Sequence, residues 1–191
     1  MRIWRVGCAR LLLTVREVPH AIGSALLLSL SRSTTVEGFR LIDTTEEPSA
    51  SAREKLKDAL HVIESNHPRA LESLRRNVKR FVLVKAGGPE YWPSVDAVVL
   101  SKATFLELSA EMSALTLVHE GMHARLRRLG VGYHKHSRRR IEEVCVRAEV
   151  QLARKLPDAA TLERVAVEKL SREWWTETAI KERRKRARSQ V

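Results

Sequence analysis

Five consecutive residues, His119-Glu120-Gly121-Met122-His123, follow the pattern HExxH. On a helix, residues four apart lie about 40° apart in azimuth and one turn apart in height, so both imidazoles can direct a nitrogen at one metal ion. Glu120 is turned by about 100° from His119 and can instead reach a water molecule on that ion. Zinc takes imidazole nitrogen readily and lowers the pKa of bound water to about 7. The motif therefore predicts a zinc site in which Glu120 is the general base.

The motif lies within the strongest helical pattern of the chain, which predicts one helix from about Thr104 to Leu129. Apolar residues recur in this segment at steps of three and four, and His119 falls within their stripe. Gly130 ends the pattern. A core histidine bonded to a carbonyl group is the competing interpretation of His119, but it gives no reason for Glu120 and His123 to accompany it.

A catalytic zinc ion takes three protein ligands and keeps a fourth position open. The candidates for the third ligand are His134 and His136 in the following loop, and Glu142, Glu143 and Glu149 on a second helix predicted from about Ser137 to Leu156. Glu142 and Glu149 are seven residues apart and share one azimuth at the edge of that helix's apolar stripe, whereas Glu143 points away from it. We expect Glu142 to be the ligand, with Glu149 and then Glu143 as alternatives. Glu149 can otherwise accept a hydrogen bond from a histidine N–H.

The spacing of these residues resembles a known group of enzymes. An HExxH helix followed by a glutamate 19 residues after His123 is similar to the gluzincin metallopeptidases, and the run from Glu142 to Pro157 resembles the ligand-bearing helix of the ImmA/IrrE-type minimal gluzincins. The resemblance covers roughly residues 80–157. It implies a single zinc ion, a peptide substrate laid along an edge strand, and Glu120 as the general base.

The elements around the motif predict an α+β fold, a small zincin-like core that is mostly helical, with a short antiparallel sheet packed on the HExxH helix. Strands are expected over Arg80–Lys85 and Val95–Ser101, and the turn-rich stretch between them suits an antiparallel pair. Residues Val95–Val99 are expected to form the edge that holds the substrate by backbone pairing. The other expected elements are a strand at Phe39–Ile42, a helix capped by Ser51, a helix starting at Pro68, and a helix from Asp158 to Trp175.

The chain of 191 residues has a formal net charge of +12. A metallopeptidase domain is expected over residues 37–175, between an N-terminal segment of uncertain order at 1–36 and a basic tail at 176–191. Basic residues are concentrated in segments 125–140 and 181–188. Such segments suit an acidic protein or an anionic surface as a partner.

The sequence thus predicts a zinc-dependent peptidase that hydrolyses peptide bonds in a peptide or protein substrate of unspecified sequence. Two alternatives stay open: a non-catalytic zinc-binding protein, and a basic nucleic-acid-binding module whose binding would fall steeply with salt. No apolar run reaches the roughly 20 residues that a transmembrane span needs. Two cysteines are too few for a disulfide framework, so a cytoplasmic location is expected, with export or peripheral membrane association as alternatives.

Overall fold

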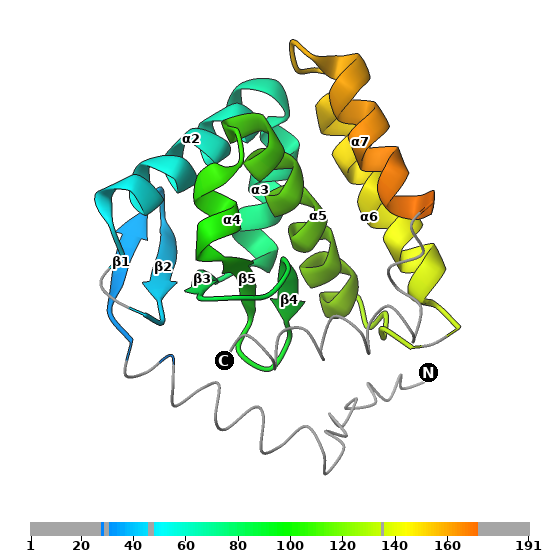
Figure 1. Cartoon of the computed structure of the whole chain (residues 1–191). Helices are drawn as coiled ribbons and strands as arrows, with labels where there is room; N and C mark the ends of the chain where they lie inside the picture. The colour runs from blue at the N-terminus through cyan, green and yellow to red at the C-terminus, as the bar shows by residue number, and fades with distance from the viewer. Residues whose placement is uncertain (1–27, 29–30, 46–47, 135, 172–191) are drawn as a thin grey trace, which may run out of the picture.

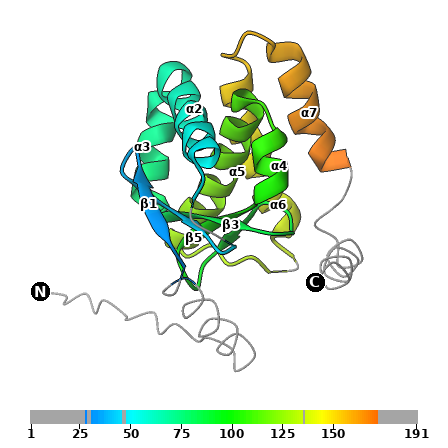
Figure 2. The ribbon, with the colours of Figure 1, turned by 60° about the vertical axis from the view of Figure 1, so that its left-hand side comes forward.

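The computed structural model describes residues 28, 31–45, 48–134 and 136–171, which form a helical layer over one face of a five-stranded sheet (Figure 1, Figure 2). The predicted α+β class is confirmed. The predicted tail at 176–191, and most of the predicted N-terminal segment at 1–36, lie outside the described residues. The part of that segment at residues 33–36 is a strand of the sheet.

The sheet is mixed, with strand order β1-β2-β3-β5-β4. Its strands are β1 (Ser33–Val36), β2 (Phe39–Asp43), β3 (Arg80–Val84), β4 (Glu90–Trp92) and β5 (Ala97–Ser101). The three central strands β2, β3 and β5 are parallel to one another, and the outer strands β1 and β4 are antiparallel to their neighbours.

The predicted antiparallel pairing of Arg80–Lys85 with Val95–Ser101 is wrong, because β3 and β5 pair in parallel. The stretch between them holds β4, so the chain reverses twice and β5 runs in the direction of β3. The predicted edge at Val95–Val99 is wrong for the same reason. β5 lies between β3 and β4, and the edge strand next to the HExxH helix is β4.

Two helices follow β2 and cover the sheet, α2 (Ala50–Asn66) and α3 (Pro68–Asn77). The cap of α2 is Ser49, whose Oγ accepts a hydrogen bond from the Ala52 amide at 3.2 Å. The predicted cap, Ser51, lies instead in the first turn of the helix. α3 begins at Pro68 as predicted, since proline at the first helical position lacks only an N–H that would have no helical partner.

The long helix predicted from Thr104 to Leu129 is two helices, α4 (Lys102–Glu107) and α5 (Ala110–Arg128). Leu108 has an extended backbone, and the Ser109 Oγ caps α5 by accepting from the Met112 amide at 3.2 Å. The apolar stripe continues across the break, so periodicity alone does not reveal it. The motif lies well inside α5 and begins about three turns after the cap.

The last two helices are α6 (Arg138–Ala153) and α7 (Ala159–Ser171). α6 packs against α5 on one side and against α7 on the other. α6 lies where the sequence predicts a helix, within a few residues at each end, and α7 begins within one residue of its predicted start. The predicted end of α7 at Trp175 lies outside the described residues. The two helices that are predicted to carry the metal ligands, α5 and α6, are therefore neighbours in the structure.

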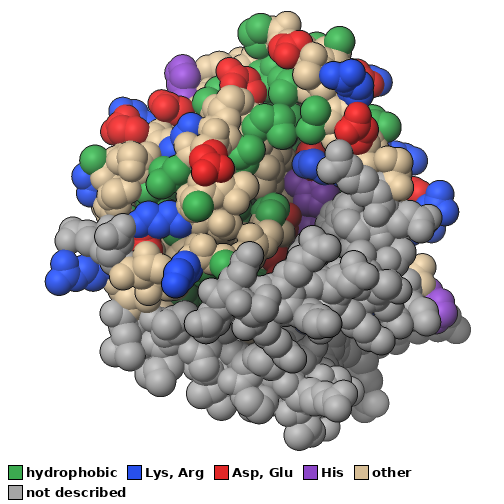
Figure 3. Space-filling model, viewed as in Figure 1, with side chains coloured by type: hydrophobic (Ala, Val, Ile, Leu, Met, Phe, Trp, Pro, Cys, Tyr) green, Lys and Arg blue, Asp and Glu red, His purple; other side chains and the backbone are tan. Residues whose placement is uncertain are grey.

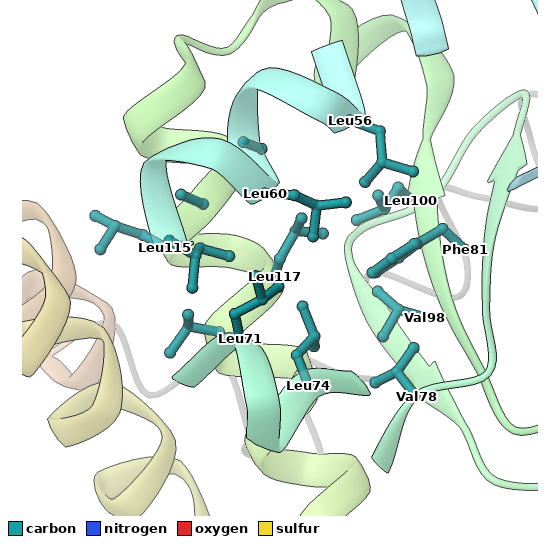
Figure 4. Close-up of a cluster of buried hydrophobic side chains, with 14 of the residues drawn as sticks. Leu56, Leu60, Leu71, Leu74, Val78, Phe81, Val98, Leu100, Leu115 and Leu117 are labelled. Atoms are coloured by element: carbon teal, nitrogen blue, oxygen red, sulfur yellow. The ribbon is translucent and has the colours of Figure 1, made fainter. Parts of the chain in front are cut away.

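The main hydrophobic core lies between the sheet and helices α2, α3 and α5 (Figure 4). Its labelled members are Leu56 and Leu60 of α2, Leu71 and Leu74 of α3, Phe81, Val98 and Leu100 of the sheet, and Leu115 and Leu117 of α5, with Val78 between α3 and β3. Each fully buried leucine contributes roughly 1.5–3 kcal/mol to stability. Gly121 belongs to this packing, because a Cβ there would lie 2.5 Å from the Leu74 Cδ1. The core thus fixes α5, and with it the motif, against the sheet.

The described part of basic segment 125–140 is mainly exposed, and two of its arginines form ion pairs. Arg128 lies 3.0 Å from Asp96, and Arg139 lies 3.2 Å from Glu143. On the face shown in Figure 3, basic and acidic side chains are interspersed. A nucleic-acid or acidic partner for this segment stays a prediction. Within the described residues, no helix combines the length and the apolar character needed to cross a membrane.

Candidate metal centre

The packing of α6 against α5 brings three predicted ligands together. His119 is buried at 4% exposure, the His123 side chain is 14% exposed, and Glu142 is completely buried. His119 and His123 lie one turn apart on α5, and Glu142 lies in the first turns of α6. The structure therefore brings together the three side chains that the sequence predicted as ligands.

The donor groups of these three side chains, two imidazoles and a carboxylate, form a small triangle in which the carboxylate faces each histidine with a different oxygen. The two Nε2 atoms of His119 and His123 lie 3.2 Å apart. Glu142 places its Oε2 3.3 Å from the His119 Nε2 and its Oε1 3.5 Å from the His123 Nε2. All three side chains thus direct nitrogen or oxygen at one point.

The size of this triangle matches the ligand spacing around zinc. With zinc–nitrogen and zinc–oxygen bonds of about 2.0–2.2 Å, neighbouring ligands of a tetrahedron are about 3.3–3.6 Å apart. The three separations, 3.2, 3.3 and 3.5 Å, lie within or close to that range. The donor set of two imidazoles and one carboxylate is also the set found in catalytic zinc sites of the His₂Glu type.

One atom of the triangle has an unsatisfied hydrogen-bonding capacity. Within the described residues, Glu142 Oε2 is buried and accepts no hydrogen bond. The other oxygen, Oε1, accepts a hydrogen bond from the Tyr133 hydroxyl at 2.5 Å. A buried carboxylate oxygen without a donor is costly, and a bound cation would remove that cost. The residues present therefore fit a metal ion.

Glu149 lies behind His119 and is completely buried. Its Oε1 is bonded to the His119 Nδ1, and its Oε2 lies 2.6 Å from the Lys169 ammonium. A carboxylate that accepts from Nδ1–H leaves the lone pair of Nε2 directed at the triangle. Glu149 was predicted either as a metal ligand or as the acceptor of a hydrogen bond from a histidine N–H. Its bond to the His119 Nδ1 fits the second role.

The charges of the cluster favour an added cation. Burial alone would lower the pKa of His119, but Glu142 and Glu149 outweigh it and raise that pKa well above 6.5. Burial would likewise raise the pKa of Glu142, yet His119 and His123 lower it to about 2. The Glu142 carboxylate therefore stays ionised, and it stabilises positive charge at the histidines, whether that charge is carried by a proton or by a metal.

Glu120, the predicted general base, is buried at 4% exposure beside His119. The charge of Glu120 is a lesser contribution, behind that of Glu142, to the raised pKa values of His119 and Cys145. A carboxylate in this position can take a proton from a water molecule held at the centre.

A buried thiol, Cys145, adds a fourth possible donor to the centre. The ligand atoms of His119, His123 and Cys145 all lie within 4.8 Å of one another. Burial, followed by the charges of the nearby glutamates, raises the pKa of the Cys145 thiol far above 9.0. The thiol is therefore protonated in the absence of a metal.

The remaining candidates from the sequence lie away from the centre. Glu143 binds Arg139 near the surface, and His134 and His136 are exposed. Two residues that the sequence did not select do contribute: Tyr133, which binds Glu142, and Lys169, which binds Glu149. The sequence does contain a sign of the role of Lys169. This lysine continues the apolar stripe of Leu162 and Ala166 at helical spacing, and lysine is unusual on a buried helix face.

Comparisons with protein-family models, with curated proteins and with solved structures found no match. The centre is therefore interpreted from its own geometry: two imidazoles and a carboxylate at zinc spacing, with a glutamate beside them and a carboxylate behind the first histidine.

Proposed function

We propose that the protein is a zinc-dependent metallopeptidase in which His119, His123 and Glu142 hold the metal and Glu120 is the general base. The observation that carries the proposal is the triangle of donor groups. The two imidazole Nε2 atoms lie 3.2 Å apart, and the Glu142 carboxylate lies 3.3 Å from one of them and 3.5 Å from the other, close to the ligand spacing of a tetrahedral zinc ion.

Bound zinc would supply a water molecule of lowered pKa and would polarise the carbonyl of the scissile bond. Glu120 takes the proton from the attacking water and passes it to the leaving nitrogen. Glu149 orients His119 through Nδ1, and Tyr133 holds one oxygen of Glu142. The burial of Glu120, Glu142 and His119 keeps bulk water from screening these interactions.

The edge strand β4 supports a peptide as the substrate class. It is the last strand in the order of the sheet and packs beside α5, which carries the motif. An edge strand offers backbone N–H and C=O groups to an extended chain, which can add to the sheet as a further strand. A substrate bound in this way would run past the HExxH helix.

The competing function is a non-catalytic zinc protein, and Cys145 is the observation that favours it. If the thiolate joined His119, His123 and Glu142, the ion would have four protein ligands, as structural zinc sites do. Such a closed site would leave no position for water. It would also give Glu120, buried beside the ligands, no chemical role.

The first experiment measures zinc content in the purified full chain. We expect about one zinc per chain in the wild type, and loss of the metal in His119→Ala and in His123→Ala. A wild type that takes up no zinc would overturn the proposal.

The second experiment measures hydrolysis of a peptide mixture by the zinc-loaded chain, with products identified by mass spectrometry. Glu120→Gln should retain zinc and lose activity by about 10²–10⁴-fold, the usual contribution of a general base. Glu111→Gln, in the first turn of the same helix, is the matched control and should keep its activity. Undiminished hydrolysis by zinc-loaded Glu120→Gln would contradict the assigned base, and absence of hydrolysis in a zinc-loaded wild type would favour the closed site.

A further inference from the structure

The carboxylate of Glu149 is bonded at both of its oxygens, to residues of two different helices. Oε1 binds the His119 Nδ1 of α5, and Oε2 lies 2.6 Å from the Lys169 Nζ of α7. The Glu149 side chain is 0% exposed, whereas that of Lys169 is 29% exposed. A chain of contacts thus runs from α7 through α6 to the first histidine of the motif.

Lys169 reaches inward because of its place on α7. It lies three and seven residues after Ala166 and Leu162, the buried positions of that helix, so it shares their face. α7 packs against α6, which carries Glu149. The lysine ammonium therefore meets the oxygen of the carboxylate that His119 does not bind.

The charge balance gives this contact a function. Three carboxylates surround the centre, those of Glu120, Glu142 and Glu149, and each is buried. One zinc ion compensates two of these negative charges, and Lys169 compensates the third. An uncompensated buried carboxylate is strongly destabilising, so removing the lysine would leave Glu149 without the partner that holds its second oxygen.

We propose that Lys169 is a positioning residue of the metal centre: it holds Glu149 against the His119 Nδ1, so that the Nε2 of that histidine faces the metal. The helix α7 then belongs to the metal site, although it carries no ligand. This inference rests on the proposed zinc site and adds a residue to it.

The test compares zinc affinities, measured by competition with a chelator on the full chain. Residues directly behind a ligand affect metal affinity by about 10–100-fold, and Lys169 acts one contact further away, so Lys169→Met should weaken zinc binding by about tenfold. Lys169→Arg keeps the charge and should restore most of the affinity. Arg164→Met removes an exposed basic residue from the same helix and should change nothing.

A double variant separates positioning from a general effect on folding. In Glu149→Gln a neutral amide replaces the carboxylate, so adding Lys169→Met should cause no further loss of zinc affinity. The double variant also covers the case in which Lys169→Met alone fails to fold, because it leaves no unpaired charge at position 149. Equal losses in the wild-type and Glu149→Gln backgrounds would overturn the positioning role.

The outcomes distinguish this inference from the proposed function. If the wild type binds zinc and Lys169→Met binds it equally well, Lys169 is not part of the site while the metallopeptidase proposal stands. If the wild type binds no zinc, the proposed function itself fails.

Discussion

Two buried carboxylates, Asp43 at the end of β2 and Glu142 on α6, are 1% and 0% exposed but are satisfied in different ways. Asp43 Oδ1 accepts hydrogen bonds from the Thr45 amide at 2.9 Å and the Thr45 hydroxyl at 2.7 Å. Its Oδ2 lies 2.8 Å from the Lys102 ammonium, a permanent cation. Thus Asp43 has its counter-ion within the protein.

Among the described residues, Glu142 has no such permanent counter-ion. Its neighbours are two histidine nitrogens that also face each other. The pair formed by Asp43 and Lys102 joins two elements of the fold, whereas the cluster around Glu142 would gain its permanent cation from the proposed zinc ion. A buried carboxylate beside a permanent cation stabilises the fold. A buried carboxylate beside histidines, which can give up their protons, indicates a binding site for a cation.

The largest expected effect concerns the pair that is already complete. Lys102→Met leaves the buried Asp43 carboxylate without its cation and should reduce the free energy of unfolding by about 3–5 kcal/mol, as measured by urea denaturation. Zinc affinity of the folded protein should not change. Lys57→Met is the control, since Lys57 forms an exposed pair with Glu54 worth at most about 1 kcal/mol. Equal losses in the two variants would contradict the structural role of Lys102.

The second effect concerns the incomplete cluster. Glu142→Ala removes a ligand and should weaken zinc binding by more than about 100-fold, beyond the effect of residues behind the ligands. Glu143→Ala, one residue along the same helix, removes only a surface contact with Arg139 and should bind zinc like the wild type. If chelator competition showed a larger loss of zinc affinity in Glu143→Ala than in Glu142→Ala, the face of α6 assigned to the metal would be wrong.

A third prediction uses acid to distinguish the two regions. Burial alone would raise the pKa of Asp43, but Lys102 and Thr45 lower it below 3.8. The folded state thus binds this proton less readily than the unfolded state, so the stabilisation is present above about pH 4 and is lost as the pH falls through the lowered pKa. The pH dependence of unfolding below pH 4 should be shallower in Asp43→Asn than in the wild type. An unchanged slope would contradict the prediction.

The smallest expected effect is that of Cys145→Ala. If the centre keeps an open position, the thiol is a neighbour rather than a ligand, and zinc affinity should change by less than about tenfold. Measuring zinc affinity and hydrolysis in the same preparation distinguishes an open metal site from a site closed by Cys145. A loss comparable to that of Glu142→Ala would support a closed site with four protein ligands.

The candidate site was largely predictable from the sequence because helical periodicity relates chemistry to position. HExxH fixes two histidines one turn apart, and the apolar stripe of the next helix indicates which glutamate faces them. The structure places Glu142 against both histidines and Glu143 near the surface, as that argument requires. The contact of Lys169 with Glu149 was missed, since it depends on how α7 packs on α6, which periodicity within one helix does not specify.

The fold was predictable in class but not in its connections. The short strand β4 lies in a stretch rich in turn residues, so the second chain reversal was missed and β3 and β5 were wrongly paired as antiparallel. The break at Leu108 was missed because the apolar spacing continues through it, while the Ser109 cap that starts α5 is a local hydrogen bond. Both errors arise where a few residues decide the chain direction against a longer regular pattern.

The most direct test of the central claim is X-ray absorption at the zinc edge on the purified, zinc-loaded chain. We predict one zinc per chain in a shell of nitrogen and oxygen at about 2.0–2.2 Å that includes two imidazoles. A sulfur neighbour at about 2.3 Å would show that Cys145 closes the site. Zinc bound without two histidines, or not bound at all, would contradict the triangle of His119, His123 and Glu142 as a metal centre.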